Sequence, residues 1–440
     1  MIVIIGGGPA GRLASMRLAS AGKQVTLIER GGIGGQCLHS GCMPVCALND
    51  VARLIHSARE LRDLGVIDAV PAPCFPELLA KMREIQQKIA SILDEETRSA
   101  GVDIIYGKTG GLSGSVAYAG DEKLEADAII VSTGSRPFVP GIAGAGLPGV
   151  FTSRTLQEME KLPAKMVIIG GSVVAAEFAY IFSTFGCDVT ILSRSTFLKD
   201  TDKHLRALAI KELAGVTIRE NMPVTAIGGE DRVASVRTPQ GQLEADAVFL
   251  AAGLVPNTGS LEGLKKGPLD EVIVDNRMRT SVKDVYACGD VVGPPYLTPV
   301  ARHQGIVAAD NILGIPRTMD DKNIPRSINL THELAYCIND SEGMGSVTAP
   351  GPAGPGSFWS VPTGDTGLSK VIFEPETGKL SGICAAGPGG GLVAGYMAFL
   401  MKRHFSVHDF EEFVEVHPST DGVYGLAKYA SSVLKKRKSP

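Results

Sequence analysis

The chain has 440 residues, too many for one ordinary hydrophobic core, so its length predicts about two to four domains. Hydrophobic residues make up 44% of it and charged residues 20%, which is typical of a globular protein and excludes a disordered one. The net charge of −4 gives no reason to expect nucleic acid or an anionic membrane as a partner.

The sequence carries no signal for a membrane or for secretion. No apolar run reaches the ~18 residues needed to cross a bilayer. A strand pattern begins at the second residue, so no signal peptide precedes the fold, and we expect a cytoplasmic protein. Eight cysteines in such a chain do not indicate a framework of structural disulfides, and most of them should be buried thiols.

The chain opens with a pattern typical of dinucleotide binding. A predicted strand over residues 2–5 runs into a turn with the spacing Gly-x-Gly-x-x-Gly, followed by a helix and a second strand. Gly6, Gly8 and Gly11 would let the backbone approach a pyrophosphate at the helix N-terminus. Glu29, at the end of the second strand, would hydrogen-bond a ribose hydroxyl. The sequence therefore predicts a first dinucleotide site.

The same unit recurs later in the chain. A predicted strand over 166–169 leads into a turn in which Gly170, Ser172 and Ala175 occupy the corresponding positions, and a helix over 177–185 follows. Two such units imply two bound dinucleotides. A duplicated fold that has lost one ligand remains an alternative.

The two units differ at the residue that would meet the adenosine ribose. The first keeps its acid, Glu29, whereas the second has Ser193 followed by Arg194. An acid repels a 2′-phosphate, and an arginine can bind it with charge-assisted hydrogen bonds. We therefore expect NADPH at the second unit. An Arg194 that points to solvent, in an enzyme that accepts both NADPH and NADH, remains open.

Later segments define the domain order. Strand-plus-glycine segments at 128–134 and 285–290 belong with the first unit, and one at 247–253 ends the second, so the second unit is inserted in the first. A long amphipathic helix is predicted over 76–100, with Leu78, Leu79, Met82, Ile85, Ile89 and Ile92 on one face. From about residue 324 the pattern becomes α+β, with strand-like pieces at 327–330, 356–360 and 370–373, a surface turn at 349–356 and a helix over 391–402. We predict an α/β fold with two doubly wound (Rossmann-like) domains, one inserted in the other, followed by an α+β domain.

A cysteine pair, Cys37 and Cys42, follows the acid of the first unit and precedes a helix predicted from Val45. A disulfide closed over four residues demands specific geometry, and a strained, accessible one is readily reduced. A cysteine at a helix N-terminus also has its thiolate stabilised. Two unconnected buried thiols are the alternative for an isolated pair of this spacing. The position directly after a dinucleotide unit favours a redox pair.

Taken together, these stretches resemble the pyridine nucleotide-disulfide oxidoreductases, the family of dihydrolipoamide dehydrogenase, glutathione reductase and mercuric reductase. The matching stretches are residues 34–44, Ser132-Thr133-Gly134, Ala287-Cys288-Gly289-Asp290 and Val416-His417-Pro418. The resemblance covers nearly the whole chain and implies FAD and NADPH as cofactors and a homodimer with shared active sites. It implies an FAD-binding domain over 1–145 and 255–323, an NAD(P)-binding domain over 146–254 and a dimerisation domain over 324–440.

The resemblance also implies residue roles. Glu29, Thr133, Gly134 and Asp290, with the first glycine turn, would bind FAD. Cys42 would lie beside the flavin and Cys37 would attack the substrate disulfide. His417 of the partner subunit would be the acid–base that activates Cys37.

Three positions depart from the family pattern. Cys46 stands where the family usually has a lysine paired with the glutamate that here is Glu177. Gly422 stands where a glutamate orients the histidine, although Asp421, one residue earlier, could orient His417 or cap the last helix. Leu254 stands where an arginine is usual. These departures argue against an ordinary dihydrolipoamide dehydrogenase or glutathione reductase, and we expect Cys46 and Glu177 to tune the flavin.

Metal chemistry is not favoured. The last 50 residues contain no cysteine, unlike the mercuric reductase branch, and Cys37, Cys42 and Cys46 are irregularly spaced for a metal. We therefore expect an NADPH-dependent, FAD-containing reductase of a small or carrier-bound disulfide. The alternatives are a dihydrolipoamide-type dehydrogenase of a multienzyme complex and a flavoprotein that passes electrons to a protein partner.

Overall fold

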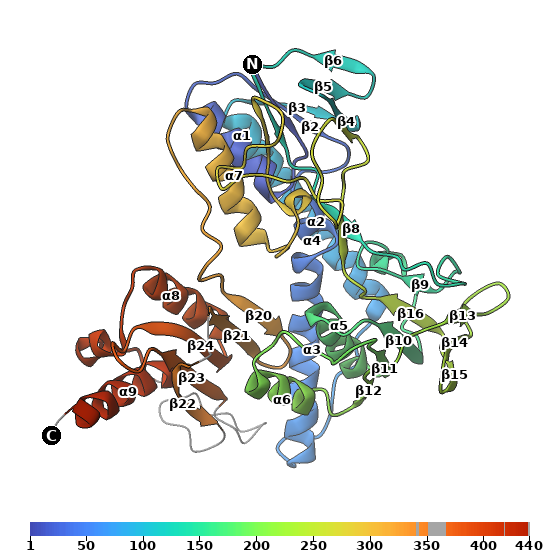
Figure 1. Cartoon of the computed structure of the whole chain (residues 1–440). Coiled ribbons are helices and arrows are strands. Elements are labelled where there is room, and N and C mark those ends of the chain that lie inside the picture. Colours follow the sequence, from blue (N-terminus) through green and yellow to red (C-terminus); the bar gives the residue numbers. More distant parts are fainter. Residues whose placement is uncertain (340–342, 351–366, 418, 439–440) are drawn as a thin grey trace.

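The computed structural model describes residues 1–339, 343–350, 367–417 and 419–438 (Figure 1). Its α-helices are α1 (Pro9–Ser20), α2 (Gly35–His39), α3 (Cys42–Asp63), α4 (Phe75–Ser99), α5 (Val173–Thr184), α6 (Lys203–Glu212), α7 (Thr298–Ile312), α8 (Gly390–Lys402) and α9 (Gly422–Lys438). Short 3₁₀ turns are η1 (Leu156–Glu158), η2 (Asp290–Val292) and η3 (Val407–Glu412). None of these helices is both long and apolar enough to cross a membrane.

The first dinucleotide unit forms a parallel sheet of five strands, in the order β19-β7-β1-β2-β3. Its strands are β1 (Ile2–Ile5), β2 (Val25–Glu29), β3 (Val102–Tyr106), β7 (Ala128–Val131) and β19 (Val285–Ala287). Every residue of β1 and β7 is buried, as expected of parallel strands covered on both faces. Since β19 comes from far along the chain and pairs with β7, the chain returns to this sheet, as the sequence predicts.

The second dinucleotide unit forms another parallel sheet, in the order β12-β11-β10-β16-β9. Its strands are β9 (Val150–Phe151), β10 (Lys165–Ile169), β11 (Asp188–Leu192), β12 (Val216–Arg219) and β16 (Ala247–Leu250). Helix α5 begins four residues before the predicted start at Glu177, because the glycine turn already ends at Ser172. Smaller sheets lie beside these two and contain β4 (Gly110–Ser113), β5 (Val116–Ala119), β6 (Glu122–Leu124), β8 (Ser135–Pro137), β13 (Ala226–Gly228), β14 (Ser235–Thr238), β15 (Gly241–Glu244), β17 (Leu254–Pro256) and β18 (Leu261–Glu262).

The C-terminal part is an antiparallel sheet in the order β20-β21-β24-β23-β22. Its strands are β20 (Arg326–Asn329), β21 (Glu333–Ile338), β22 (Gly345–Pro350), β23 (Leu368–Phe373) and β24 (Leu380–Gly387). Helices α8 and α9 cover one face, and the other face shares a hydrophobic core with α5. The strand predicted at 356–360 lies outside the described residues, and the start of the predicted turn, 349–350, belongs to β22. The domain boundaries given above remain our proposal.

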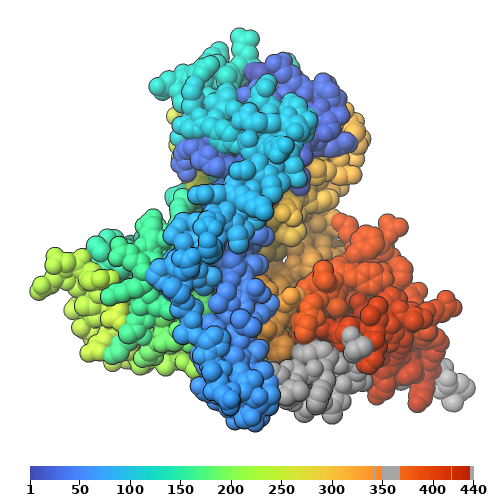
Figure 2. All heavy atoms as spheres, turned by 180° about the vertical axis from the view of Figure 1, so that it is seen from behind, coloured from blue at the N-terminus to red at the C-terminus, as the bar shows by residue number. Residues whose placement is uncertain are grey.

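Helices α3 and α4 form a column that joins the parts of the molecule. Seen from behind, the first hundred residues run from top to bottom between the second unit and the C-terminal part (Figure 2). Helix α3 begins at Cys42, three residues before the predicted start. Only part of the predicted apolar face of α4 is buried, since Leu79 is 1% exposed but Ile85 is 58% exposed.

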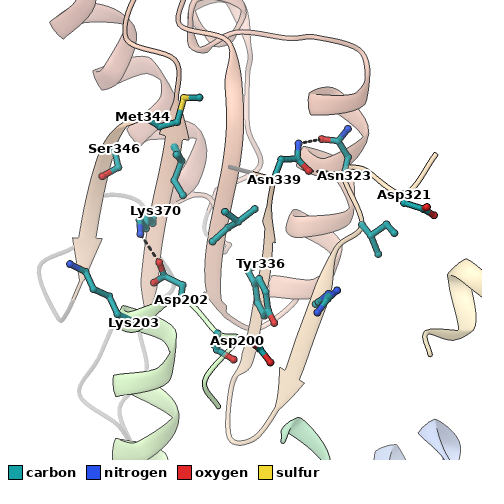
Figure 3. Close-up of a pocket in the computed structure, with 15 residues that line it drawn as sticks. Asp200, Asp202, Lys203, Asp321, Asn323, Tyr336, Asn339, Met344, Ser346 and Lys370 are labelled. Atoms are coloured by element: carbon teal, nitrogen blue, oxygen red, sulfur yellow. Dashed lines mark hydrogen bonds and ion pairs between the residues drawn. The ribbon is translucent and has the colours of Figure 1, made fainter. Parts of the chain in front are cut away.

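Helix α6 of the second unit is held to the C-terminal sheet at both ends. At its start Asp202 pairs with Lys370 of β23 at 2.6 Å, and at its end Glu212 pairs with His332 at 2.6 Å. All four side chains are nearly buried. The first pair lies in the wall of a cavity of about 690 Å³ between α6 and the sheet (Figure 3).

Candidate active site

The cysteine pair lies where α2 meets α3, beside the edge of the first parallel sheet. Cys37 is on the short helix α2, and Cys42 is the first residue of α3, so its thiol lies at a helix N-terminus. Both are free thiols in the structure. The Thr298 hydroxyl at the start of α7 is 3.8 Å from the Cys42 sulfur, within hydrogen-bonding range for sulfur.

The pKa values of the two thiols are shifted in opposite directions. A hydrogen bond from Cys42 lowers the pKa of Cys37 to about 6 against the effect of burial, and Thr298 and the Arg302 guanidinium lower it further. The same hydrogen bond, together with desolvation, raises the pKa of Cys42. Cys37 is therefore the more acidic thiol of the pair. A thiolate is the nucleophile in disulfide exchange.

A cavity of about 450 Å³ extends from the first glycine turn to the cysteine pair. The sequence-predicted residues that line it are Gly6, Gly8, Glu29, Cys37, Cys42, Thr133, Gly134 and Asp290. Gly11 packs instead against the strand, where an added Cβ would lie 2.1 Å from the Gly6 carbonyl oxygen, so only glycine fits. Gln36 Oε1 and Tyr296 Oη are buried at this cavity without a hydrogen-bond partner among the described residues. A long, polar ligand such as FAD fits this combination of a glycine-lined wall, an acid and unsatisfied polar atoms.

The residues at the two ends of the cavity are fixed by hydrogen bonds. Glu29 accepts hydrogen bonds from the Gly7 and Gly31 amides, both at 2.7 Å. Asp290 accepts one from the Ser135 hydroxyl at 2.7 Å, and burial raises its pKa.

Thr133 and Gly134 are fixed by a residue that returns from the second unit. The Asn257 side chain donates to the Thr133 carbonyl at 2.9 Å, and the Asn257 amide donates to the Gly134 carbonyl at 2.9 Å. Gly134 has φ +69°, a left-handed conformation that favours glycine.

Cys46 and Glu177 lie behind the cysteine pair. Glu177 is buried on α5 and accepts two hydrogen bonds from Asn329, from its amide and its side chain, both at 3.0 Å. Burial raises the pKa of Glu177 to about 7 despite these bonds. Partial burial and the nearby Cys42 and Glu177 raise the pKa of Cys46. Cys46 lines a separate cavity of about 460 Å³ between α3 and α4, where Asn49 and Arg53 also lie.

The second glycine turn has the geometry of a nucleotide-binding turn. At Gly170 an added Cβ would lie 2.2 Å from the Ala251 carbonyl oxygen, Ser172 precedes α5, and Ala175 is fully buried. Ser193 is buried with its hydroxyl toward Gly171, whereas Arg194 is exposed. The positions of Ser193 and Arg194 are compatible with a 2′-phosphate but do not select one.

His417 lies outside this cavity, in the C-terminal part of the same chain. Its Nδ1 is 2.7 Å from Asp421 Oδ2, with the imidazole 65% exposed and the carboxylate 4% exposed. Asp421 directly precedes α9, so it occupies the position of a helix cap while its side chain contacts the histidine. Within one chain the structure does not bring His417 into the cavity that holds Cys37.

Sequence reasoning missed several residues of the site. Thr298, Tyr296, Ser135 and Asn257 all line the cavity. A Thr-Pro pair at the start of a helix could have identified Thr298, because proline in the first turn marks a helix N-terminus. Asn329, the partner of Glu177, carries no local signal, since it lies on a strand 152 residues further along the chain.

Comparison with known proteins identifies the class. Residues 1–305 match the family model described as pyridine nucleotide-disulphide oxidoreductase, so the chain belongs to this family. It is therefore an FAD-dependent pyridine nucleotide-disulfide oxidoreductase, an enzyme that uses FAD and a pyridine nucleotide.

The similarity to individual relatives covers nearly the whole chain. It is 27% identical to dihydrolipoyl dehydrogenase of Bacillus subtilis, covering 95% of both chains. It is 28% identical to mercuric reductase of Shigella flexneri, covering 99% of this chain and 81% of the relative. Among solved structures it resembles the HOCl-induced flavoprotein disulfide reductase RclA from Escherichia coli, with a TM-score of 0.86, 26% identity and coverage of 97% and 99%. These matches confirm the predicted fold class.

Proposed function

We propose that the protein is a cytoplasmic, homodimeric, NADPH-dependent reductase of a small or carrier-bound disulfide. The observation that carries the proposal is the position of the pair: Cys37 and Cys42 line the cavity that begins at the first glycine turn, and Cys37 is the more acidic thiol. An exposed relay for electrons has no need of one nucleophilic thiol. A reductase that attacks a disulfide requires one.

FAD and the two cysteines would carry out successive parts of the reaction. When bound, FAD supplies a ring that accepts a hydride from the nicotinamide and passes two electrons to the Cys37–Cys42 disulfide. The Cys37 thiolate then attacks one sulfur of the substrate and releases the first thiol, leaving a mixed disulfide. Cys42 attacks Cys37 and releases the second thiol, which restores the internal disulfide. One NADPH and one proton are consumed for each disulfide reduced to two thiols.

Glu29, Asp290, Thr133 and Gly134 would hold FAD in the cavity that ends at the cysteine pair. His417 of the partner subunit would hold the proton exchanged with Cys37 and the leaving thiol. The exposed imidazole and its buried carboxylate partner support this role, because the ring is oriented and still accessible.

A dimer is supported by exposed apolar side chains in the C-terminal part of the chain. Val414 and Val416 are 89% and 79% exposed. On α8, Leu392 and Phe399 are 82% and 59% exposed and lie along one side of the helix. Such a concentration of exposed apolar side chains is typical of a protein interface.

NADPH as donor rests on Ser193 and Arg194, since neither repels a 2′-phosphate. Arg194→Ala should lower kcat/KM for NADPH selectively and leave the value for NADH nearly unchanged. Arg232→Ala, at an exposed arginine elsewhere in the same unit, is the matched control. A wild-type enzyme that prefers NADH would contradict the assignment of the donor.

Steady-state oxidation of NADPH with a panel of disulfides tests the reaction itself. We expect turnover with at least one low-molecular disulfide and loss of that turnover in Cys37→Ser. The resemblance to dihydrolipoyl dehydrogenases supports a second candidate, reduction of NAD by dihydrolipoamide. Faster NAD reduction by dihydrolipoamide than any disulfide reduction would favour that candidate. Turnover only with a protein electron acceptor would contradict both.

A further inference from the structure

Helix α7 presents two polar residues on the side where the cysteine pair lies. Farther along the same side, α7 packs against α1: Gly305 approaches Ala10 so closely that an added Cβ would lie 2.3 Å from the Ala10 carbonyl oxygen. Thr298, whose hydroxyl contacts the Cys42 sulfur, is in the first turn of α7. Arg302 is four residues later, and residues four apart share one face of a helix. Arg302 therefore lies one turn beyond the thiols.

The Arg302 side chain is exposed and makes no ion pair with a carboxylate in the described part of the chain. Two other arginines that reach α7 are paired, since Arg17 and Arg317 both bind Asp310. Arg302 is nevertheless close enough to Cys37 to contribute to its acidity. An unpaired guanidinium beside a nucleophilic sulfur can contact any charged group that a substrate carries near its disulfide.

The overall electrostatic field of the protein would not produce a preference for anionic substrates. The net charge is −4, so long-range attraction does not favour an anionic substrate. A preference for anions would have to come from a local contact at the site. Arg302 is a residue that can provide such a contact.

We propose that Arg302 determines substrate specificity and selects disulfides that carry a carboxylate or a similar anion within a few bonds of the sulfur. This inference rests on the proposed disulfide reductase function and names its substrate class. Arg302 would bind the anion while Cys37 attacks the adjacent sulfur. Its planar guanidinium would hold a carboxylate through two hydrogen bonds.

Three disulfides of similar length test the proposal with the FAD-loaded enzyme. Dithiodipropionate carries two carboxylates, hydroxyethyl disulfide is uncharged, and cystamine carries two ammonium groups. We expect kcat/KM of the wild type to be at least about tenfold higher for dithiodipropionate than for cystamine, as a charge-assisted contact implies. Arg302→Gln should reduce this ratio to near one, and Arg302→Lys should retain part of it.

The control variant is Arg237→Gln, which removes the same charge from an exposed position on strand β14 and should keep the wild-type ratio. Flavin content and reduction of the flavin by NADPH should be unchanged in Arg302→Gln. If Arg302→Gln slows all three disulfides equally, Arg302 acts only on the Cys37 thiolate and the proposal is overturned. An unchanged ratio, or a wild type that prefers cystamine, also overturns it. A wild type that reduces none of the three would instead count against the proposed function.

Discussion

Cys46 stands where the family resemblance places a lysine, near the buried Glu177. The structure shows how Glu177 is accommodated without that cation. Asn329 donates two hydrogen bonds to it, and burial raises its pKa to about 7, which favours the neutral carboxyl group. The chain thus lacks a positive charge and also carries less negative charge at this point.

Cys46→Lys should raise the midpoint potential of the bound flavin. A cation near the ring stabilises the reduced, anionic form. It should also lower the pKa of Glu177, since an adjacent cation favours the carboxylate. Equilibration with reference dyes measures the potential, and the neutral variant Cys46→Ser is the control. An unchanged potential in Cys46→Lys would mean that the side chain stays in the α3–α4 cavity and does not affect the ring.

Asp421 combines two features that the sequence left as alternatives, because it precedes α9 and also contacts His417. Asp421→Asn should keep the helix but lose the carboxylate that orients the imidazole. We expect disulfide turnover to fall at least about tenfold, since a carboxylate partner orients a catalytic histidine. Reduction of the flavin by NADPH should not change.

Asp409→Asn is the control for Asp421→Asn, because Asp409 caps the turn η3 away from His417. It should affect thermal stability without affecting turnover. Full turnover in Asp421→Asn would leave Asp421 only the role of a cap.

At the scale of secondary structure, α6 is fixed by charges that come from another part of the chain. Burial opposes ionisation of Asp202, but the hydrogen bonds from Lys370 and the His204 amide outweigh it and leave its pKa below the usual value. A carboxyl pKa that is lower in the folded than in the unfolded protein stabilises the fold. This stabilisation is fully present at a pH above the unfolded-state pKa of about 4, and it is lost as the pH falls through the folded-state pKa. The Asp202–Lys370 pair should therefore stabilise the folded protein at neutral pH.

Lys370→Met should lower the thermal unfolding midpoint sharply at pH 7, because it leaves Asp202 buried without a cation, at a cost of about 3–5 kcal/mol. Adding Asp202→Asn should recover most of the loss. Lys402→Met is the control, since Lys402 and Asp320 form a pair with side chains 46% and 42% exposed, worth about 0–1 kcal/mol. Equal effects of Lys370→Met and Lys402→Met would show that burial of the first pair does not matter.

Elements built from local patterns could be predicted from the sequence, and contacts between distant segments could not. The strands β1 and β10 lie within one residue of their predictions, since buried apolar runs before glycine turns define them. The prediction that Ile85 shares a buried face was only partly right, because burial depends on what packs against the helix. Asn329 and Lys370 reach their partners through the fold alone, so no local pattern indicates them.

At the scale of the whole molecule, the proposed dimer would supply the acid–base that the cavity of one chain lacks. Mixing Cys37→Ser subunits with His417→Ala subunits, each inactive as a homodimer, tests this arrangement. Random exchange gives half heterodimers, each with one intact site, so about a quarter of wild-type turnover should return. Mixtures that stay inactive although subunits exchange would place His417 and Cys37 in the same chain.

The most direct measurement of the central claim counts the thiols that NADPH releases. The oxidised, FAD-loaded enzyme is treated with one equivalent of NADPH per subunit without oxygen, alkylated, and analysed by peptide mass spectrometry. We predict two new thiols per subunit, at Cys37 and Cys42, with Cys37 labelled first because its pKa is the lower of the two. No new thiol at either cysteine, or faster labelling of Cys42 than of Cys37, would contradict it.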